Sequence, residues 1–282
     1  MKNLIPVLRN FLKKLKVFGE SKKLIERFIE GKRWWYFLPR KIRFKIFNLK
    51  FLRKYKTSTG DYFLPFFAFK DRIRNSIIKN EIFDKKIFIT IKNLIKPNSI
   101  VIDVGANFGQ MSVLWSKCKT DVEVYSFEAS NYIFQILEKN IKVNKANVKP
   151  FNYFVGNKTN KDLLIEKPNL RDFTTYGSNH LREVSNKSIS EVEKVEAIKI
   201  DDLRFNKNIS AMKIDVQGYD LEVLKGAKNT INKHKMPIVF EYEKDFEKNL
   251  NYKFDNFKKF IEEINYEINH KIDETNYLIL PK

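Results

Sequence analysis

The chain has 282 residues, 43% of them hydrophobic, and a formal net charge of +20. This length fits one large domain or one domain with an extension, and the apolar fraction is enough for a buried core. One cysteine, Cys118, excludes an internal disulfide and is typical of a reducing compartment. No apolar run predicts a membrane span or a signal peptide, so we expect a cytoplasmic protein. The three histidines have no metal-ligand spacing.

The positive charge is concentrated at the N-terminus. Residues 1–60 contain 18 Lys and Arg and 3 Asp and Glu (18 − 3 = +15), which leaves +5 for the other 222 residues. The sequence therefore predicts a basic amphipathic extension over residues 1–60 and a main domain over residues 61–282, with a hinge at residues 57–61. The main domain is close to neutral for its size, which argues against a nucleic-acid partner.

The extension has apolar residues at helical spacing from Leu4 to Phe18 and four aromatic residues at positions 34–37. These features are typical of a basic amphipathic helix with interfacial aromatic side chains. One interpretation is peripheral attachment to an anionic membrane at its inner face, where each basic residue adds about 1 kcal/mol. The alternatives are a helical cap on the main domain and contact with a polyanion or a partner protein.

Residues 100–117 predict a strand, a glycine turn and a helix in that order. Residues 100–104 read Ile-Val-Ile-Asp-Val, which is typical of a buried parallel strand. Gly105 and Gly109 follow in a G-x-x-x-G spacing, unlike the dinucleotide-binding and P-loop patterns. Gly105 allows a ligand close to the backbone, and the helix start offers unpaired N–H groups. We predict a small-ligand site here; the alternative is a turn that only packs.

Two later strands also end in an acidic residue. Residues 122–128 end at Glu128, about 20 residues after the glycine turn, where a Rossmann-like sheet places a carboxylate on ribose hydroxyls. Residues 211–216 carry Asp215 just before a turn at Gly218. Ligands of open α/β sheets bind at the carboxyl edge of the strands, so we expect these acids to share one site.

Four motifs in this order resemble the FkbM family of class I methyltransferases, which depend on S-adenosylmethionine. They are residues 101–107 (VIDVGAN), 127–128 (FE), 200–203 (IDDL) and 213–220 (KIDVQGYD). The resemblance spans roughly residues 78–282. It implies an α/β Rossmann-like fold, with a mostly parallel seven-stranded sheet covered by helices on both faces. The chain departs from the family pattern at Ala129, where Pro is usual, and at Asn157, where Asp is usual.

The resemblance also implies the roles of individual residues. The methionine part of the cofactor would lie along the glycine turn, the ribose at Glu128 and the adenine near Asn157. The implied cofactor-binding residues are Asp103, Gly105, Ala106, Asn107, Gly109, Phe127, Glu128 and Asn157.

Hydrophobic periodicity and the residues that start and stop helices predict the remaining elements. Helices are expected over residues 81–95, 130–141, 221–231 and 254–264, and strands over residues 148–155, 163–165, 195–200, 237–242, 266–268 and 277–280, with the last two pairing. Residues 167–192 are expected to form a long polar loop, which is either a lid or acceptor loop over the cofactor edge or a disordered insertion.

Methyl transfer to a hydroxyl needs an aligned acceptor and a base for its proton. Asp215 is the first candidate for this base, Glu241 the second and His180 in the polar loop the third. Asp215 and Glu241 could instead hold a divalent cation, but two carboxylates are too few to argue for a metal, and we assign none.

The resulting hypothesis is an S-adenosylmethionine-dependent O-methyltransferase acting on a sugar, glycan or glycolipid hydroxyl. Two alternatives stay open: a nucleic-acid methyltransferase, which the basic extension favours, and a non-catalytic protein that binds a membrane or partner and carries a degenerate domain.

Overall fold

The protein is described by a computed structural model that covers residues 52–66, 68, 70–166, 192–247 and 252–282. The features predicted for residues 1–51, including the amphipathic helix, lie outside these ranges, as does most of the long polar loop with His180.

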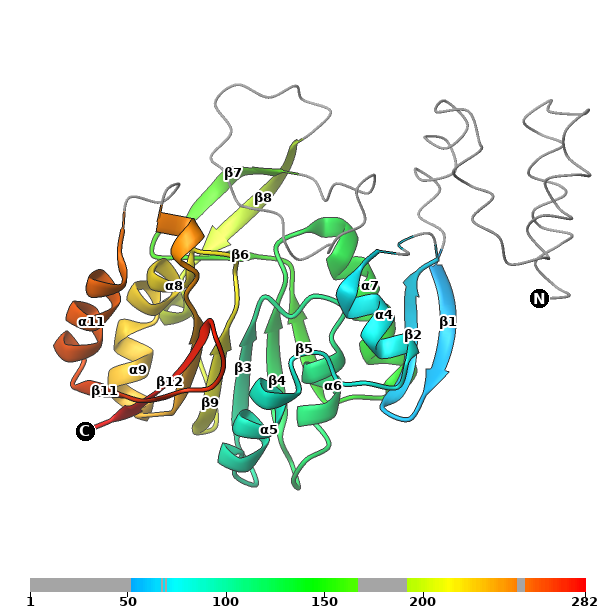
Figure 1. Cartoon of the computed structure of the whole chain (residues 1–282), viewed down its shortest axis with the longest axis horizontal. Coiled ribbons are helices and arrows are strands. Elements are labelled where there is room, and N and C mark those ends of the chain that lie inside the picture. Colours follow the sequence, from blue (N-terminus) through cyan, green and yellow to red (C-terminus); the bar gives the residue numbers. More distant parts are fainter. Residues whose placement is uncertain (1–51, 67, 69, 167–191, 248–251) are drawn as a thin grey trace, which may run out of the picture. The chain divides into compact units, whose positions relative to one another are not determined.

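A seven-stranded sheet forms the centre of the fold (Figure 1). Its strands, in sheet order, are β11 (Tyr266–Lys271), β12 (Asn276–Pro281), β10 (Ile238–Glu241), β9 (Ile209–Ile214), β3 (Ile100–Val104), β4 (Glu123–Phe127) and β5 (Val148–Phe151). The five strands from β10 to β5 are parallel, whereas β12 runs antiparallel to both β10 and β11. The predicted mostly parallel sheet and its closing pair are confirmed.

Helices cover both faces of this sheet. All five residues of β3 are buried, and alternate residues pack on opposite faces because side chains alternate along a strand. Ile102 packs with α8 (Asp220–Gly226), α9 (Lys228–His234) and α11 (Phe254–Glu263), and Val101 packs with α5 (Lys85–Leu94) and α6 (Gln110–Trp115). Each such fully buried side chain contributes about 1.5–3 kcal/mol, so the sheet is firmly held from both sides.

A hairpin precedes the central sheet. It consists of β1 (Leu52–Thr57) and β2 (Gly60–Pro65), and α4 (Arg72–Ile78) follows it. Residues 57–61, predicted as a hinge, instead form the turn of this hairpin and its first pairs. The hairpin is fixed to α7 (Asn131–Asn144), where Oδ1 of Asn140 accepts from the Phe63 N–H at 2.6 Å and Oδ1 of Asn144 from the Asp61 N–H at 2.9 Å. The compact unit therefore begins at Phe51.

A second, three-stranded sheet contains β6 (Phe154–Val155), β8 (Val192–Ile198) and β7 (Asn160–Glu166). The predicted strand over residues 148–155 is wrong as one element, because it divides between this sheet and β5. The amide of Asn152 donates to the carbonyls of Glu128 (2.8 Å) and Ala129 (3.1 Å), which turns the chain between the two strands.

The described ranges also contain two short 3-10 helices, η3 (Ile200–Asp202) and η4 (Lys244–Phe246). In the described ranges, no helix combines the length and the apolar character that crossing a membrane requires.

Candidate active site

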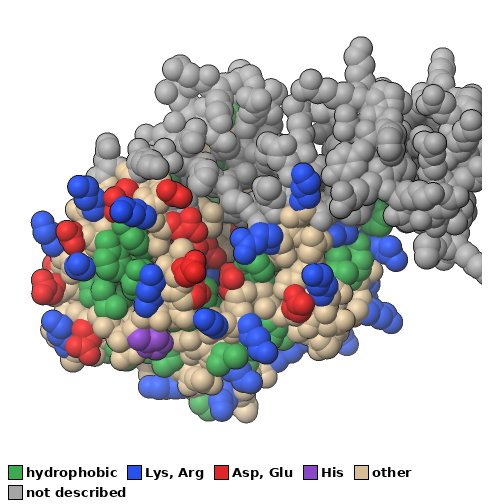
Figure 2. All heavy atoms as spheres, in the orientation of Figure 1, with side chains coloured by type: hydrophobic (Ala, Val, Ile, Leu, Met, Phe, Trp, Pro, Cys, Tyr) green, Lys and Arg blue, Asp and Glu red, His purple; other side chains and the backbone are tan. Residues whose placement is uncertain are grey.

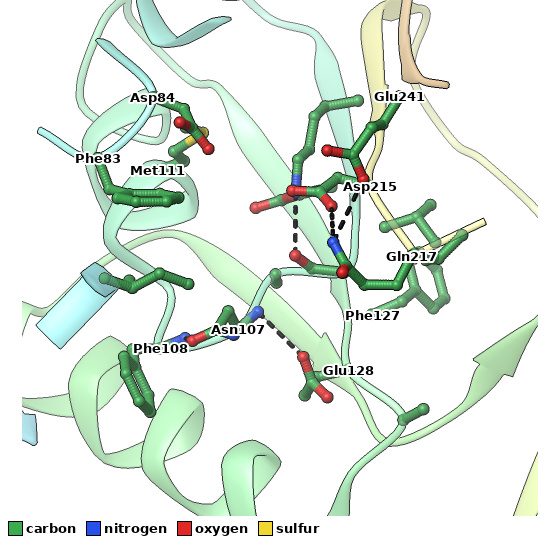
Figure 3. Close-up of a pocket in the computed structure, with 18 of the residues that line it drawn as sticks. Phe83, Asp84, Asn107, Phe108, Met111, Phe127, Glu128, Asp215, Gln217 and Glu241 are labelled. Carbon is green, nitrogen blue, oxygen red and sulfur yellow. Dashed lines mark hydrogen bonds and ion pairs between the residues drawn. The ribbon is translucent and has the colours of Figure 1, made fainter. Parts of the chain in front are cut away.

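A cavity of about 750 Å³ lies at the carboxyl ends of the parallel strands. Its lining includes nearly all the residues that the sequence predicts for the site (Figure 3): Asp103, Gly105, Ala106, Asn107, Gly109, Phe127, Glu128, Asp215 and Glu241. Phe154, Val155 and Ile165 of the second sheet line the same cavity. Asn157 follows β6 and is not among the lining residues, so its adenine contact stays a prediction, and His180 lies outside the described residues.

The glycine turn brings the end of β3 against the end of β9. Gly105 has a φ of +80°, and a Cβ there would lie 1.9 Å from the carbonyl oxygen of Asp215. Gly109, with a φ of +82°, then starts α6. Because only glycine fits at Gly105 without displacing β9, the turn is a close backbone cradle on the cavity wall.

Glu128 is held by the backbone at the end of β4. Its Oε2 accepts the N–H of Asn107 at 3.0 Å, and its Oε1 accepts the N–H of Ser130 at 3.0 Å. Burial raises the pKa of Glu128 to about 7, and these two N–H groups oppose the rise. Each carboxylate oxygen keeps another lone pair, so Glu128 can accept hydrogen bonds from a pair of neighbouring hydroxyls.

Lys213 connects the glycine turn with two carboxylates. Its Nζ donates to the carbonyl of Gly105 at 3.0 Å and lies 3.3 Å from Oδ2 of Asp215 and 3.5 Å from Oδ1 of Asp103. Burial alone would lower the pKa of Lys213, but the charges of Asp215 and Asp103 raise it above its ordinary value. Sequence reasoning gave Lys213 no role, although a charged residue inside the apolar strand β9 is a signal that could have identified it.

Asp103 is buried and faces α6. Its Oδ2 accepts a hydrogen bond from the Ser112 hydroxyl, which in turn accepts one from the Ser126 hydroxyl at 2.8 Å. Among the described residues, Oδ1 of Asp103 has no hydrogen-bond donor besides the ion pair with Lys213. This oxygen on the cavity wall is therefore available to a donor group of a ligand.

Asp215 and Glu241 lie side by side at the ends of β9 and β10 (Figure 3). The Gln217 amide nitrogen donates to both carboxyl groups, at 3.2 Å in each case. Burial and the nearby charges of Asp215 and Asp220 raise the pKa of Glu241 well above neutrality. Asp215 also forms an ion pair with Lys213, whereas burial favours the protonated form of Glu241.

Comparison with known proteins identifies the family of this chain. Residues 103–268, more than half of the chain, match the methyltransferase FkbM domain family. The chain belongs to the FkbM methyltransferase family. It is 27% identical over 142 residues to the hexuronic acid methyltransferase AglP of Haloferax volcanii, a match that covers 50% of this chain and 55% of that protein. It therefore spans about half the length of this curated relative.

Solved structures with a similar fold include methyltransferases. One is the FkbM methyltransferase of Methylobacillus flagellatus KT, with 17% identity, a TM-score of 0.44 and coverage of 66% of this chain and 44% of that chain. Another is a TehB-like S-adenosylmethionine-dependent methyltransferase of Corynebacterium glutamicum, with 12% identity, a TM-score of 0.41 and coverage of 75% and 94%.

The donor side of this FkbM methyltransferase fits S-adenosylmethionine. The Gly105 cradle admits a ligand close to the backbone. Oδ1 of Asp103 can accept a hydrogen bond from a donor group of the cofactor. Glu128 can accept hydrogen bonds from two neighbouring hydroxyls, as on a ribose. Among the described residues, no group of three or more His, Cys, Asp or Glu side chains has a metal-site arrangement.

Proposed function

We propose that this FkbM-family methyltransferase transfers the methyl group of S-adenosylmethionine to a hydroxyl of a sugar, glycan or glycolipid. The observation that carries the proposal is that the glycine cradle, Glu128 and Asp215 line one cavity. The name of the curated relative, a hexuronic acid methyltransferase, supports a sugar acceptor.

Asp215 is the proposed base for the acceptor hydroxyl. The hydroxyl oxygen forms a bond to the methyl carbon while the carbon–sulfur bond breaks. The electron pair of the broken bond stays on sulfur. The hydroxyl proton passes to the carboxylate of Asp215. When bound, the sulfonium of the cofactor supplies the electrophilic methyl group, so the tasks left to the protein are alignment and proton removal.

Lys213 and Gln217 fix the direction of the Asp215 carboxyl group. Lys213 contacts one of its oxygens at 3.3 Å and Gln217 the other at 3.2 Å. Nζ of Lys213 also donates to the carbonyl of Gly105. Lys213 therefore fixes the position of Asp215 relative to the glycine turn. Protonated Glu241 can donate a hydrogen bond to the acceptor from the neighbouring strand.

Calorimetric titration with S-adenosylhomocysteine tests the donor half of the proposal. We expect micromolar binding to the wild-type chain. Glu128→Ala should weaken it about 10- to 100-fold, because charged hydrogen bonds contribute about 1.5–3 kcal/mol each. Glu262→Ala, at an exposed position of α11, is the matched control. Absence of binding by wild-type protein would contradict the proposal.

Transfer of a labelled methyl group to a glycan panel tests the acceptor half. Asp215→Asn should lower the rate about 10²- to 10⁴-fold and leave the affinity for S-adenosylhomocysteine within a few-fold of wild type, because a positioned base acts on the acceptor alone. Equal rates for the two proteins would remove Asp215 from the proposed role.

We further propose that residues 1–60 hold the enzyme at an anionic membrane surface. Their charge of +15 (18 − 3) and their aromatic residues support this. Co-sedimentation with vesicles that contain anionic lipid should exceed that with neutral vesicles and should fall as salt is added. Equal sedimentation with both would contradict it.

A further inference from the structure

The candidate active-site cavity is acidic although the chain is strongly basic. The whole chain carries +20, but the described lining has eight carboxyl groups against three cations, a formal balance of 3 − 8 = −5. The cations are Arg72, Lys86 and Lys213, and the acids are Asp84, Asp103, Glu128, Asp215, Glu241, Glu243, Asp273 and Glu274.

Most of these acids lie away from the donor turn. Asp103 is paired with Lys213, and Glu128 is held at the end of β4. The other six come from four chain segments: the residue before α5, the end of β9, the end of β10, and the turn between β11 and β12. Figure 3 shows Asp84 across the cavity from Asp215 and Glu241, and Figure 2 shows acidic side chains gathered in the middle of the visible face.

The carboxyl groups on this side of the cavity, among them Asp84, Asp215 and Glu241, repel one another when ionised. Burial raises the pKa of Asp84 to about 6, and the charges of Asp215 and Asp273 add to the rise more than Lys213 and Arg72 oppose it. Burial and Asp215 likewise favour the protonated form of Glu241. Burial first, and then these neighbouring charges, disfavour the ionised forms of Asp84 and Glu241, so a bound cation would stabilise those forms.

The methyl donor does not supply enough positive charge. With its sulfonium, ammonium and carboxylate groups, S-adenosylmethionine brings one net positive charge and leaves the cavity negative. An acceptor that carries a carboxylate would meet like charges on several sides.

We propose that the acceptor of this enzyme carries a cationic amino group close to the methylated hydroxyl, as an amino sugar does, and that it is not a hexuronic acid. Asp84, Asp273 and Glu274 would face the ammonium group, while Asp215 takes the hydroxyl proton. This inference rests on the proposed methyltransferase function and adds the charge class of its substrate.

Three methyl glycosides of similar size test the proposal: glucosamine, glucose and glucuronic acid. Each is titrated by calorimetry into the full-length chain saturated with S-adenosylhomocysteine. We expect the amine to bind at least about tenfold more tightly than the carboxylate, which corresponds to about 1.4 kcal/mol, and the difference to shrink as salt is added. The neutral glycoside should fall between them.

Asp84→Asn is the informative variant, because Asn tolerates the φ of +48° that Asp84 adopts. It should reduce the preference for the amine several-fold and leave the affinity for S-adenosylhomocysteine unchanged. Asp255→Asn, at an exposed position of α11, should change neither.

Two outcomes would overturn the proposal: the glucuronide binding as tightly as the glucosaminide, or no binding of the glucosaminide by protein that binds S-adenosylhomocysteine. Failure to bind S-adenosylhomocysteine would instead refute the methyltransferase function itself, so the two failures are distinguishable.

Discussion

Replacing Lys213 with Met removes the buried cation that Asp103 and Asp215 share. The Lys213 side chain is 5% exposed and that of Asp103 is 1% exposed, so the lost charge cannot be replaced by bulk water. Removing one partner of a buried ion pair costs about 3–5 kcal/mol. Asp215 is 25% exposed and can be partly resolvated, so we expect the lower end, about 3 kcal/mol.

The unfolding midpoint in urea or heat measures this effect. For a domain of this size about 3 kcal/mol lowers Tm by roughly 6–12 °C. Lys225→Met is the control, because Lys225 forms an exposed pair with Glu222 at 2.7 Å, and such pairs contribute less than about 1 kcal/mol. Lys213→Met should also weaken S-adenosylhomocysteine binding several-fold, since the Gly105 carbonyl loses its donor.

Unfolding of Lys213→Met within about 1 kcal/mol of the Lys225→Met control would contradict this prediction. That result would mean that Asp103 and Asp215 do not depend on the cation, and the assignment of Lys213 as the link between donor turn and base would fail.

Three further predictions concern the cavity and the hairpin. Gly105→Ala should destabilise the fold by about 2–5 kcal/mol and weaken S-adenosylhomocysteine binding, because its Cβ would lie 1.9 Å from a carbonyl oxygen; calorimetry showing wild-type affinity would contradict this. Asp84 has a folded pKa of about 6 against an ordinary 3.8, so its stabilising contribution is complete below pH 3.8 and is lost as pH rises through 6. Between pH 4 and 6.5 the wild type should therefore lose on the order of 1–2 kcal/mol more stability than Asp84→Asn, and parallel urea-unfolding profiles would show that Asp84 is not perturbed. Asn140→Ala should lose about 2–3 kcal/mol, because the buried Asn140 amide bonds both the N–H (2.6 Å) and the carbonyl (3.2 Å) of Phe63; unfolding that matches the wild type would argue against hairpin docking on α7.

The sequence by itself determined the central sheet and most of the donor side. Runs rich in apolar residues identified β3, β4 and β9, because a strand buried on both faces consists mostly of apolar residues. Acids directly after such runs must meet at one edge of a parallel sheet, which is why Glu128 and Asp215 were predicted to share a site and do line one cavity. The family motifs lie on these same segments, and the family match confirms the resemblance.

Only the tertiary structure decided which side chains meet across the cavity. Asp84 and Asp215 are far apart along the chain, and no local pattern reveals that they face each other. The contact of Lys213 with Asp103 depends on the parallel pairing of β9 with β3, and the division of residues 148–155 depends on the long-range hydrogen bonds of Asn152. Local sequence fixes which backbone shape a segment prefers, whereas the protonation of Glu241 and the charge of the cavity depend on groups that folding brings together.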